Sequence, residues 1–110
     1  MHVHLSVIQQ LNDRLDLGRE KYGHGVRVDD DPRTWGCVKN SWFEMAREEF
    51  LDGIIYCVAD YIRNHKQKRK KSQPDDNERI LQLVETPGEI YSLKHRRIVL
   101  LLKQLIEDCQ

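Results

Sequence analysis

Three carboxylates, Glu48, Glu49 and Asp52, occur within one five-residue stretch. In a helix, Asp52 is one turn from each of the two glutamates, so either pair could share an ion. None of the three has a basic residue three or four positions away. Each like-charge pair on an exposed helix costs about 0.2–0.5 kcal/mol. The pattern therefore predicts either a solvated helix face or a site for Mg²⁺, which prefers hard oxygen ligands and keeps waters and substrate phosphates; Mn²⁺ could substitute.

A second group of carboxylates precedes the first. Asp13, Asp16 and Glu20 fall within about 60° of one another if residues 5–22 are helical. Asp16 could instead pair with Arg19. Helical bundles build metal sites between facing helices. If the two acidic groups face each other, the sequence predicts a pocket of four or five carboxylates.

The elements that must position these residues are all helical. Apolar residues recur at helical spacing in several segments, and no β pattern is found. The stretch "TPGE" predicts a capping box for the last helix, with Thr86 as the N-cap. The predicted helices are Leu5–Tyr22, about Lys39–Lys66, residues 78–85, and Ile90 to about Asp108. We expect one all-α domain over 1–110, a small bundle of about four helices completed by oligomerisation. Its parts are a helical core (5–66) with the acidic site, a basic connector (67–76) and C-terminal helices (77–108).

The second helix is predicted to be central. Its apolar residues cover roughly 200° of the helix, about twice the usual stripe. The carboxylates share the remaining arc. The C-terminal helices could complete the bundle of their own chain or exchange between chains.

Composition narrows the classes of function. The 110 residues carry 18 basic and 18 acidic side chains. A neutral balance does not favour nucleic-acid binding, and the basic run "KQKRKK" reads as a solvated linker. No apolar run is long enough to span a membrane, and the N-terminus does not resemble a signal peptide. Three widely spaced cysteines favour a reducing compartment. We therefore expect a cytoplasmic protein.

Two motifs together resemble a known family. "REKYG" (19–23) closes a helix, a loop with a Trp follows, and "AREEFLDGIIY" (46–56) carries an E-E-x-x-D core. This arrangement is similar to that of the all-α nucleoside triphosphate pyrophosphohydrolases, the MazG-like and phage dATP/dGTP diphosphohydrolase-like group. The resemblance covers about residues 5–63.

The resemblance implies Mg²⁺-dependent hydrolysis of a (deoxy)nucleoside triphosphate to monophosphate and pyrophosphate, in homodimers or homotetramers. Glu49 and Asp52 would be metal ligands, with Glu48 a further ligand or the group that orients water. The other acidic pair of the family, E-x-x-E, has no clean counterpart. Asp13 and Asp16 have the spacing, with Glu20 the nearest glutamate; alternatively, Glu44 and Glu48 supply those charges. Because this set is incomplete, a non-catalytic module that binds a nucleotide or a protein is the rival interpretation.

Hydrolysis between phosphates also requires cations and a place for the base. The candidate phosphate contacts are Arg19, Lys21, Lys39 and Arg47, each of which could equally be a surface cation. Trp35 could stack on a base or belong to the core.

Overall fold

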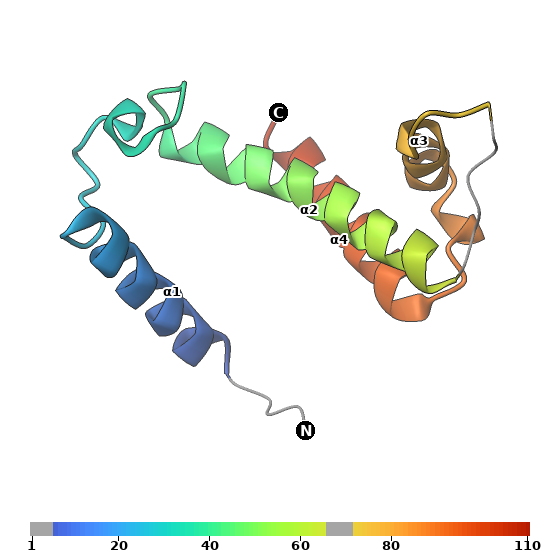
Figure 1. Cartoon of the computed structure of the whole chain (residues 1–110), viewed down its shortest axis with the longest axis horizontal. Helices are drawn as coiled ribbons and strands as arrows, with labels where there is room; N and C mark the ends of the chain where they lie inside the picture. Colours follow the sequence, from blue (N-terminus) through green and yellow to red (C-terminus); the bar gives the residue numbers. More distant parts are fainter. Residues whose placement is uncertain (1–5, 66–71) are drawn as a thin grey trace.

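The structure, a computed structural model, describes residues 6–65 and 72–110, and these contain helices and no strand. The predicted all-α class is confirmed. In chain order the elements are α1 (Val7–Tyr22), the 3₁₀ helix η1 (Pro32–Trp35), α2 (Trp42–Asn64), α3 (Asn77–Glu85), the 3₁₀ helix η2 (Pro87–Glu89) and α4 (Leu93–Asp108), shown in Figure 1.

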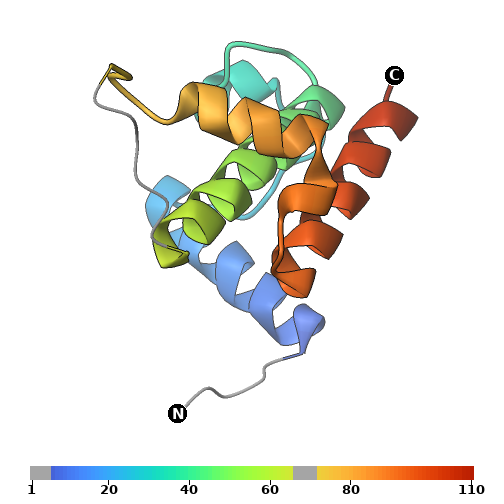
Figure 2. The same cartoon turned by 90° about the vertical axis from the view of Figure 1, so that its right-hand side faces the viewer.

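The core lies where α2 packs against α4 and α3 (Figures 1 and 2). One side of α2 supplies about half of it, which confirms that α2 is the central helix. At Gly53 the two long helices come close, since a Cβ there would lie 3.3 Å from Cδ1 of Leu102. The buried apolar residues are Ile54, Val58, Tyr61, Ile62, Leu83, Ile90, Val99 and Ile106.

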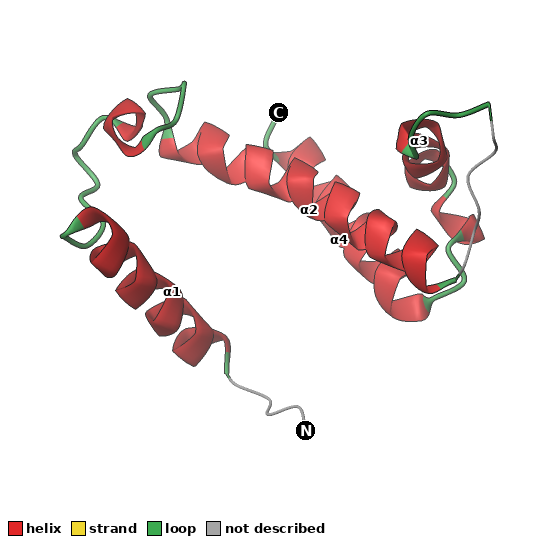
Figure 3. Cartoon of the chain, in the orientation of Figure 1, coloured by secondary structure: helices red, strands yellow, loops and turns green. Residues whose placement is uncertain are grey.

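Helix α1 stands apart from this packed part, as Figures 1 and 3 show. None of its residues is buried. Leu11, in the middle of its apolar stripe, is 51% exposed. The radius of gyration is 17.1 Å, whereas a compact domain of this length is expected to have about 13 Å. Tyr22, the last residue of α1, is also exposed.

The first two helices begin slightly later than predicted. The Ser6 hydroxyl accepts a hydrogen bond from the backbone N–H of Gln9 and caps α1. Gly23 ends α1 with a φ of 79°, a conformation that glycine adopts without strain. Ser41 caps α2 by accepting from the N–H of Glu44, so the helix starts at Trp42. These serines satisfy backbone donors that the helices leave unpaired.

The prediction for the start of the last helix is wrong. The Thr86 hydroxyl donates to the carbonyl of Gln82 and caps nothing. A 3₁₀ turn follows, and α4 begins at Leu93 with Ser92 as its N-cap. Proline is favoured at the first position of an α-helix and also fits the start of a 3₁₀ helix. Pro87 therefore does mark a helix start, but the helix is the short 3₁₀ helix η2.

The basic connector lies partly outside the described residues, which exclude 66–71 and therefore the run "KQKRKK". Residues 72–76 lead into α3. Among the helices of the described residues, none has the length and apolar character needed to cross a membrane.

Candidate carboxylate site on α2

The three carboxylates of the motif lie on the side of α2 that the other helices leave uncovered. At 100° per residue, Asp52 and Glu49 are about 160° and 140° from the buried Ile54. Glu49 is exposed, whereas Glu48 and Asp52 are half-buried. The packing of α2 on α4 and α3 therefore directs the acidic arc away from the core.

Glu48 has a basic partner that helical spacing does not reveal. The Nζ atom of Lys39 lies 2.9 Å from Oε1 of Glu48. This hydrogen bond raises the pKa of Lys39. Lys39 precedes the N-cap of α2 and folds back over the first turns of the helix. The repulsion expected from sequence is thus partly compensated.

Glu49 and Asp52 have no partner in the part of the chain that the structure describes. Neither makes a hydrogen bond or ion pair within residues 6–65 and 72–110. In the same part of the chain, no three His, Cys, Asp or Glu side chains come close enough to hold a metal together. Two carboxylates one turn apart still fit Mg²⁺, because this ion keeps several waters and takes substrate phosphates as further ligands.

The carboxylates of α1 do not join those of α2 within one chain. Asp16 instead pairs with Arg19 at 3.2 Å on the surface of α1. Asp13, Asp16 and Glu20 also lie on the side of α1 opposite its apolar stripe, since Asp16 is about 140° from Leu11. An α1 that buried its apolar stripe would turn these three carboxylates outward. The pocket of four or five carboxylates is not formed in the single chain.

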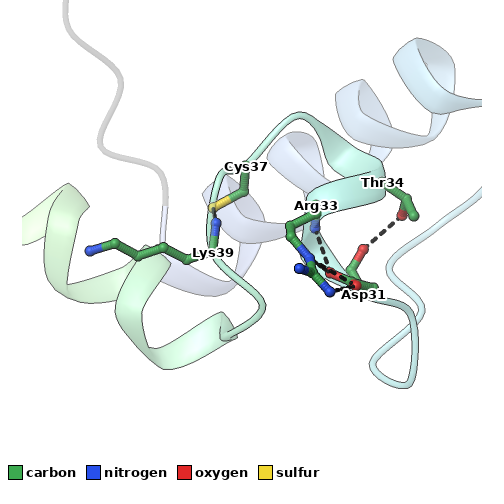
Figure 4. A network of polar contacts seen from close by, with 5 residues as sticks. All are labelled: Asp31, Arg33, Thr34, Cys37 and Lys39. Carbon is green, nitrogen blue, oxygen red and sulfur yellow. Dashed lines mark hydrogen bonds and ion pairs between the residues drawn. The ribbon is translucent and has the colours of Figure 1, made fainter.

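The loop between α1 and α2 is ordered by local polar contacts (Figure 4). Asp31 caps η1 by accepting from the N–H of Arg33, and its carboxylate holds the Arg33 guanidinium at 2.6–3.0 Å. Hydrogen bonds from Arg33 lower the pKa of Asp31. The Lys39 N–H donates to Sγ of Cys37 at 3.4 Å. This local structure of the loop places Lys39 next to Glu48.

Trp35 lies in an aromatic cluster that joins the ends of α1 and α2. Its ring centroid is 4.7 Å from Tyr22, 5.0 Å from His24 and 5.9 Å from Trp42. The indole N–H of Trp42 donates to the carbonyl of Val28 at 2.9 Å. The Trp35 ring already packs against three other rings, which favours a role in packing over stacking on a base.

The remaining candidate cations lie on different elements. Arg47, on α2, is half-buried and has no charged partner among the described residues. Arg19 and Lys21 lie in the last turn of α1. Lys21 Nζ sits 5.2 Å from the ring centroid of Tyr22. Of these candidates, Lys39 contacts a carboxylate of the motif, whereas Arg47 is about 140° from Asp52 around α2.

A groove that the sequence did not reveal continues the uncovered face of α2. It has a volume of about 700 Å³ and runs between α2 and α3. Tyr56, Asp60 and Arg63 line it from α2, and Asp76 and Ile80 from the other side. Tyr56 is one turn from Asp52 and is 68% exposed. None of the three carboxylates lines the groove, and Tyr56 is its lining residue nearest to Asp52 along the helix.

Sequence reasoning also missed a polar network between α2 and α4. Nε2 of His95, which is 7% exposed, lies 2.7 Å from Oδ2 of Asp60. Nδ1 of His95 contacts the hydroxyl of Ser92. The sequence contains one local hint of this network, Ser92 three residues before His95. This spacing predicts the contact between those two residues but does not identify Asp60 as the third partner. The network joins two helices and makes no contact with the carboxylates of the motif.

Comparison with known proteins identified no relative: no protein-family model, curated protein or solved structure matches the chain significantly.

Proposed function

We propose that the chain is the subunit of a cytoplasmic, Mg²⁺-dependent nucleoside triphosphate pyrophosphohydrolase that acts as a homo-oligomer. The observation that carries the proposal is the pair Glu49 and Asp52, one turn apart and unpartnered within the described residues. The pair lies on the uncovered face of α2, and Asp52 is one turn from Tyr56, which lines a groove. The resemblance of residues 5–63 to the MazG-like group supports the same reaction.

Glu49 and Asp52 would hold the ion, which supplies positive charge to phosphate oxygens. A water would attack the α-phosphorus, the bond to the bridging oxygen would break, and pyrophosphate would leave. Glu48 could orient that water as a hydrogen-bond acceptor. The Lys39 ammonium beside Glu48 could neutralise the charge on the leaving pyrophosphate.

The groove between α2 and α3 offers room for the nucleoside. Ligand sites of this kind are clefts of roughly 300–1,000 Å³ with a few polar groups. The exposed ring of Tyr56, one turn beyond Asp52, could stack on a base. The phosphates and the nucleoside would then lie along one face of α2.

A non-catalytic helical module is the second candidate. It is favoured by the absence of a third potential metal ligand near Glu49 and Asp52 in the described part of the chain. It is also favoured by the pairing of Glu48 with Lys39. Such a module would bind a nucleotide or a protein partner without turnover.

Product analysis distinguishes the two. The purified chain is incubated with each ribo- and deoxyribonucleoside triphosphate and Mg²⁺, and the products are separated by ion-exchange chromatography. The proposal predicts equal amounts of monophosphate and pyrophosphate, abolished by EDTA and restored by Mg²⁺ or Mn²⁺. Binding of a triphosphate without any product would support the module, and release of inorganic phosphate alone would reject the proposed reaction.

A further inference from the structure

The chain exposes far more surface than a folded monomer of its size. Its accessible surface is 9086 Å². A compact monomer of 13.1 kDa is expected to expose about 6,400 Å², so the excess is about 2,700 Å². A standard protein interface buries about 800 Å² on each partner, and obligate dimers bury more. The excess is large enough for a stable dimer.

Much of the uncovered apolar surface belongs to α1. The helix has 16 residues and is therefore about 24 Å long. Its stripe consists of Val7, Ile8, Leu11 and Leu15, which are all exposed. A stripe of this kind forms a stable helix in water only when it packs against another surface.

The loop of the same chain holds this stripe away from the core. Trp35 contacts both Tyr22, the last residue of α1, and Trp42, the first residue of α2. The aromatic cluster therefore ties together the neighbouring ends of the two helices. From that point α1 and α2 diverge, as Figure 1 shows. No described residue of the same chain buries the stripe.

The uncovered face of α2 complements the stripe in polarity and charge. On α1, basic residues flank the apolar stripe: Arg14 and Lys21 lie on one side and Arg19 on the other. On α2, the half-exposed Leu51 and Ile55 lie beside the acidic residues of the motif. A basic-edged apolar helix and an acid-edged apolar helix face fit each other.

We propose that the occupant of this face is a second copy of the chain. The α1 stripe of each copy packs on the Leu51–Ile55 face of α2 in the other, which gives a closed two-fold dimer. The contact brings Arg19 and Lys21 of the second copy towards Glu49 and Asp52. Only this last consequence rests on the proposed function: the two cations would then meet the substrate phosphates, so that each site would contain residues of both copies.

Light scattering after size exclusion tests the dimer with the full chain. The expected mass is twice 13.1 kDa. Leu11→Lys places a charge in the centre of the stripe and is expected to weaken dimerisation at least tenfold, whereas Gln9→Lys, on the opposite side of α1, leaves it unchanged. Circular dichroism checks that both variants are helical. A monomeric wild-type chain, or equal behaviour of the two variants, would overturn the proposal.

Photo-crosslinking tests the docking site without a destabilising charge. A benzoylphenylalanine replaces Leu15 in a mixture of ¹⁴N- and ¹⁵N-labelled chains. The proposal requires mixed-isotope crosslinks from α1 to the 48–59 segment of α2; crosslinks confined to one chain, or directed to α4, contradict it. A dimer with this crosslink but no pyrophosphate release would reject the enzyme and keep the interface. A monomer that releases pyrophosphate would keep the enzyme and reject the interface.

Discussion

Asp60 and His95 connect the two longest packed helices through a 2.7 Å contact between Oδ2 and Nε2. With Nε2–H donating to the carboxylate, Nδ1 is free to accept from the Ser92 hydroxyl, whose oxygen also accepts from the His95 N–H. The contact anchors the first turn of α4 to the last third of α2. It closes the end of the bundle that lies furthest from α1.

This contact makes stability depend on pH. The hydrogen bond from His95 lowers the pKa of Asp60, with a smaller contribution from the charge of Lys94. A carboxylate with a lowered folded-state pKa stabilises the protein above its ordinary pKa of 3.8 and loses this effect as the pH falls through the folded value. Melting temperatures between about pH 5 and pH 2 should therefore fall more steeply for wild type than for Asp60→Asn. Parallel curves would show that the contact contributes nothing.

The core of α3 depends on Leu83, which is fully buried, whereas Leu81 on the same helix is 63% exposed. Leu83→Ala should lower the free energy of unfolding by about 2–5 kcal/mol, because it removes buried methyl groups and leaves a cavity. Leu81→Ala should change it by less than about 0.5 kcal/mol. Urea denaturation measures both. A similar cost for the two variants would mean that α3 does not pack on α2 as described.

Tyr61 contributes a buried hydroxyl to the junction before α4. It accepts from the N–H of Tyr91 at 3.1 Å and donates to the carbonyl of Glu89 at 3.4 Å. Tyr61→Phe leaves the N–H of Tyr91 without its acceptor and should cost about 1–3 kcal/mol. Tyr56→Phe, at an exposed position, serves as the matched control in the same denaturation experiment. If Tyr61→Phe were as stable as that control, the Tyr61 hydroxyl would not contribute to stability.

Lys39 is expected to contribute to catalytic activity. Its ammonium pairs with Glu48, which precedes Glu49 and is one turn from Asp52. If it neutralises charge on the triphosphate, Lys39→Met should lower kcat/KM about tenfold, a loss of roughly 1.4 kcal/mol of transition-state stabilisation. Arg63→Met, further along α2, serves as the comparison for a cation near the nucleoside. If the kinetics of Lys39→Met were unchanged, Lys39 would pair with Glu48 but would have no role in neutralising the triphosphate.

The sequence predicted the helices well because their signals are local. Apolar residues at helical spacing, Gly23 after α1 and the width of the apolar face of α2 all depend on residues within a few turns. The start of α4 was misplaced because Thr86 and Pro87 suit a short 3₁₀ turn as well as an α-helix. Ser92, three residues before His95, was the competing cap.

The candidate site was only partly predictable, because its features depend on contacts that are distant in sequence. Helical spacing placed the carboxylates on one arc of α2, but it could not show that Lys39 returns from the loop to Glu48. Nor could it show that α1 lies away from α2, since an amphipathic stripe does not specify which chain covers it. The pairing of Asp60 with His95, 35 residues apart, has no local signal.

The most direct test of the central claim is the Mg²⁺-dependent release of pyrophosphate by Asp52→Asn. The variant keeps the size of the side chain and removes the charge that would hold the ion, so the account predicts a loss of kcat/KM of at least about 100-fold. Glu107→Gln, an exposed change on α4, should retain wild-type activity. Pyrophosphate release by Asp52→Asn at the wild-type rate would contradict the assignment of the α2 carboxylates as the active site.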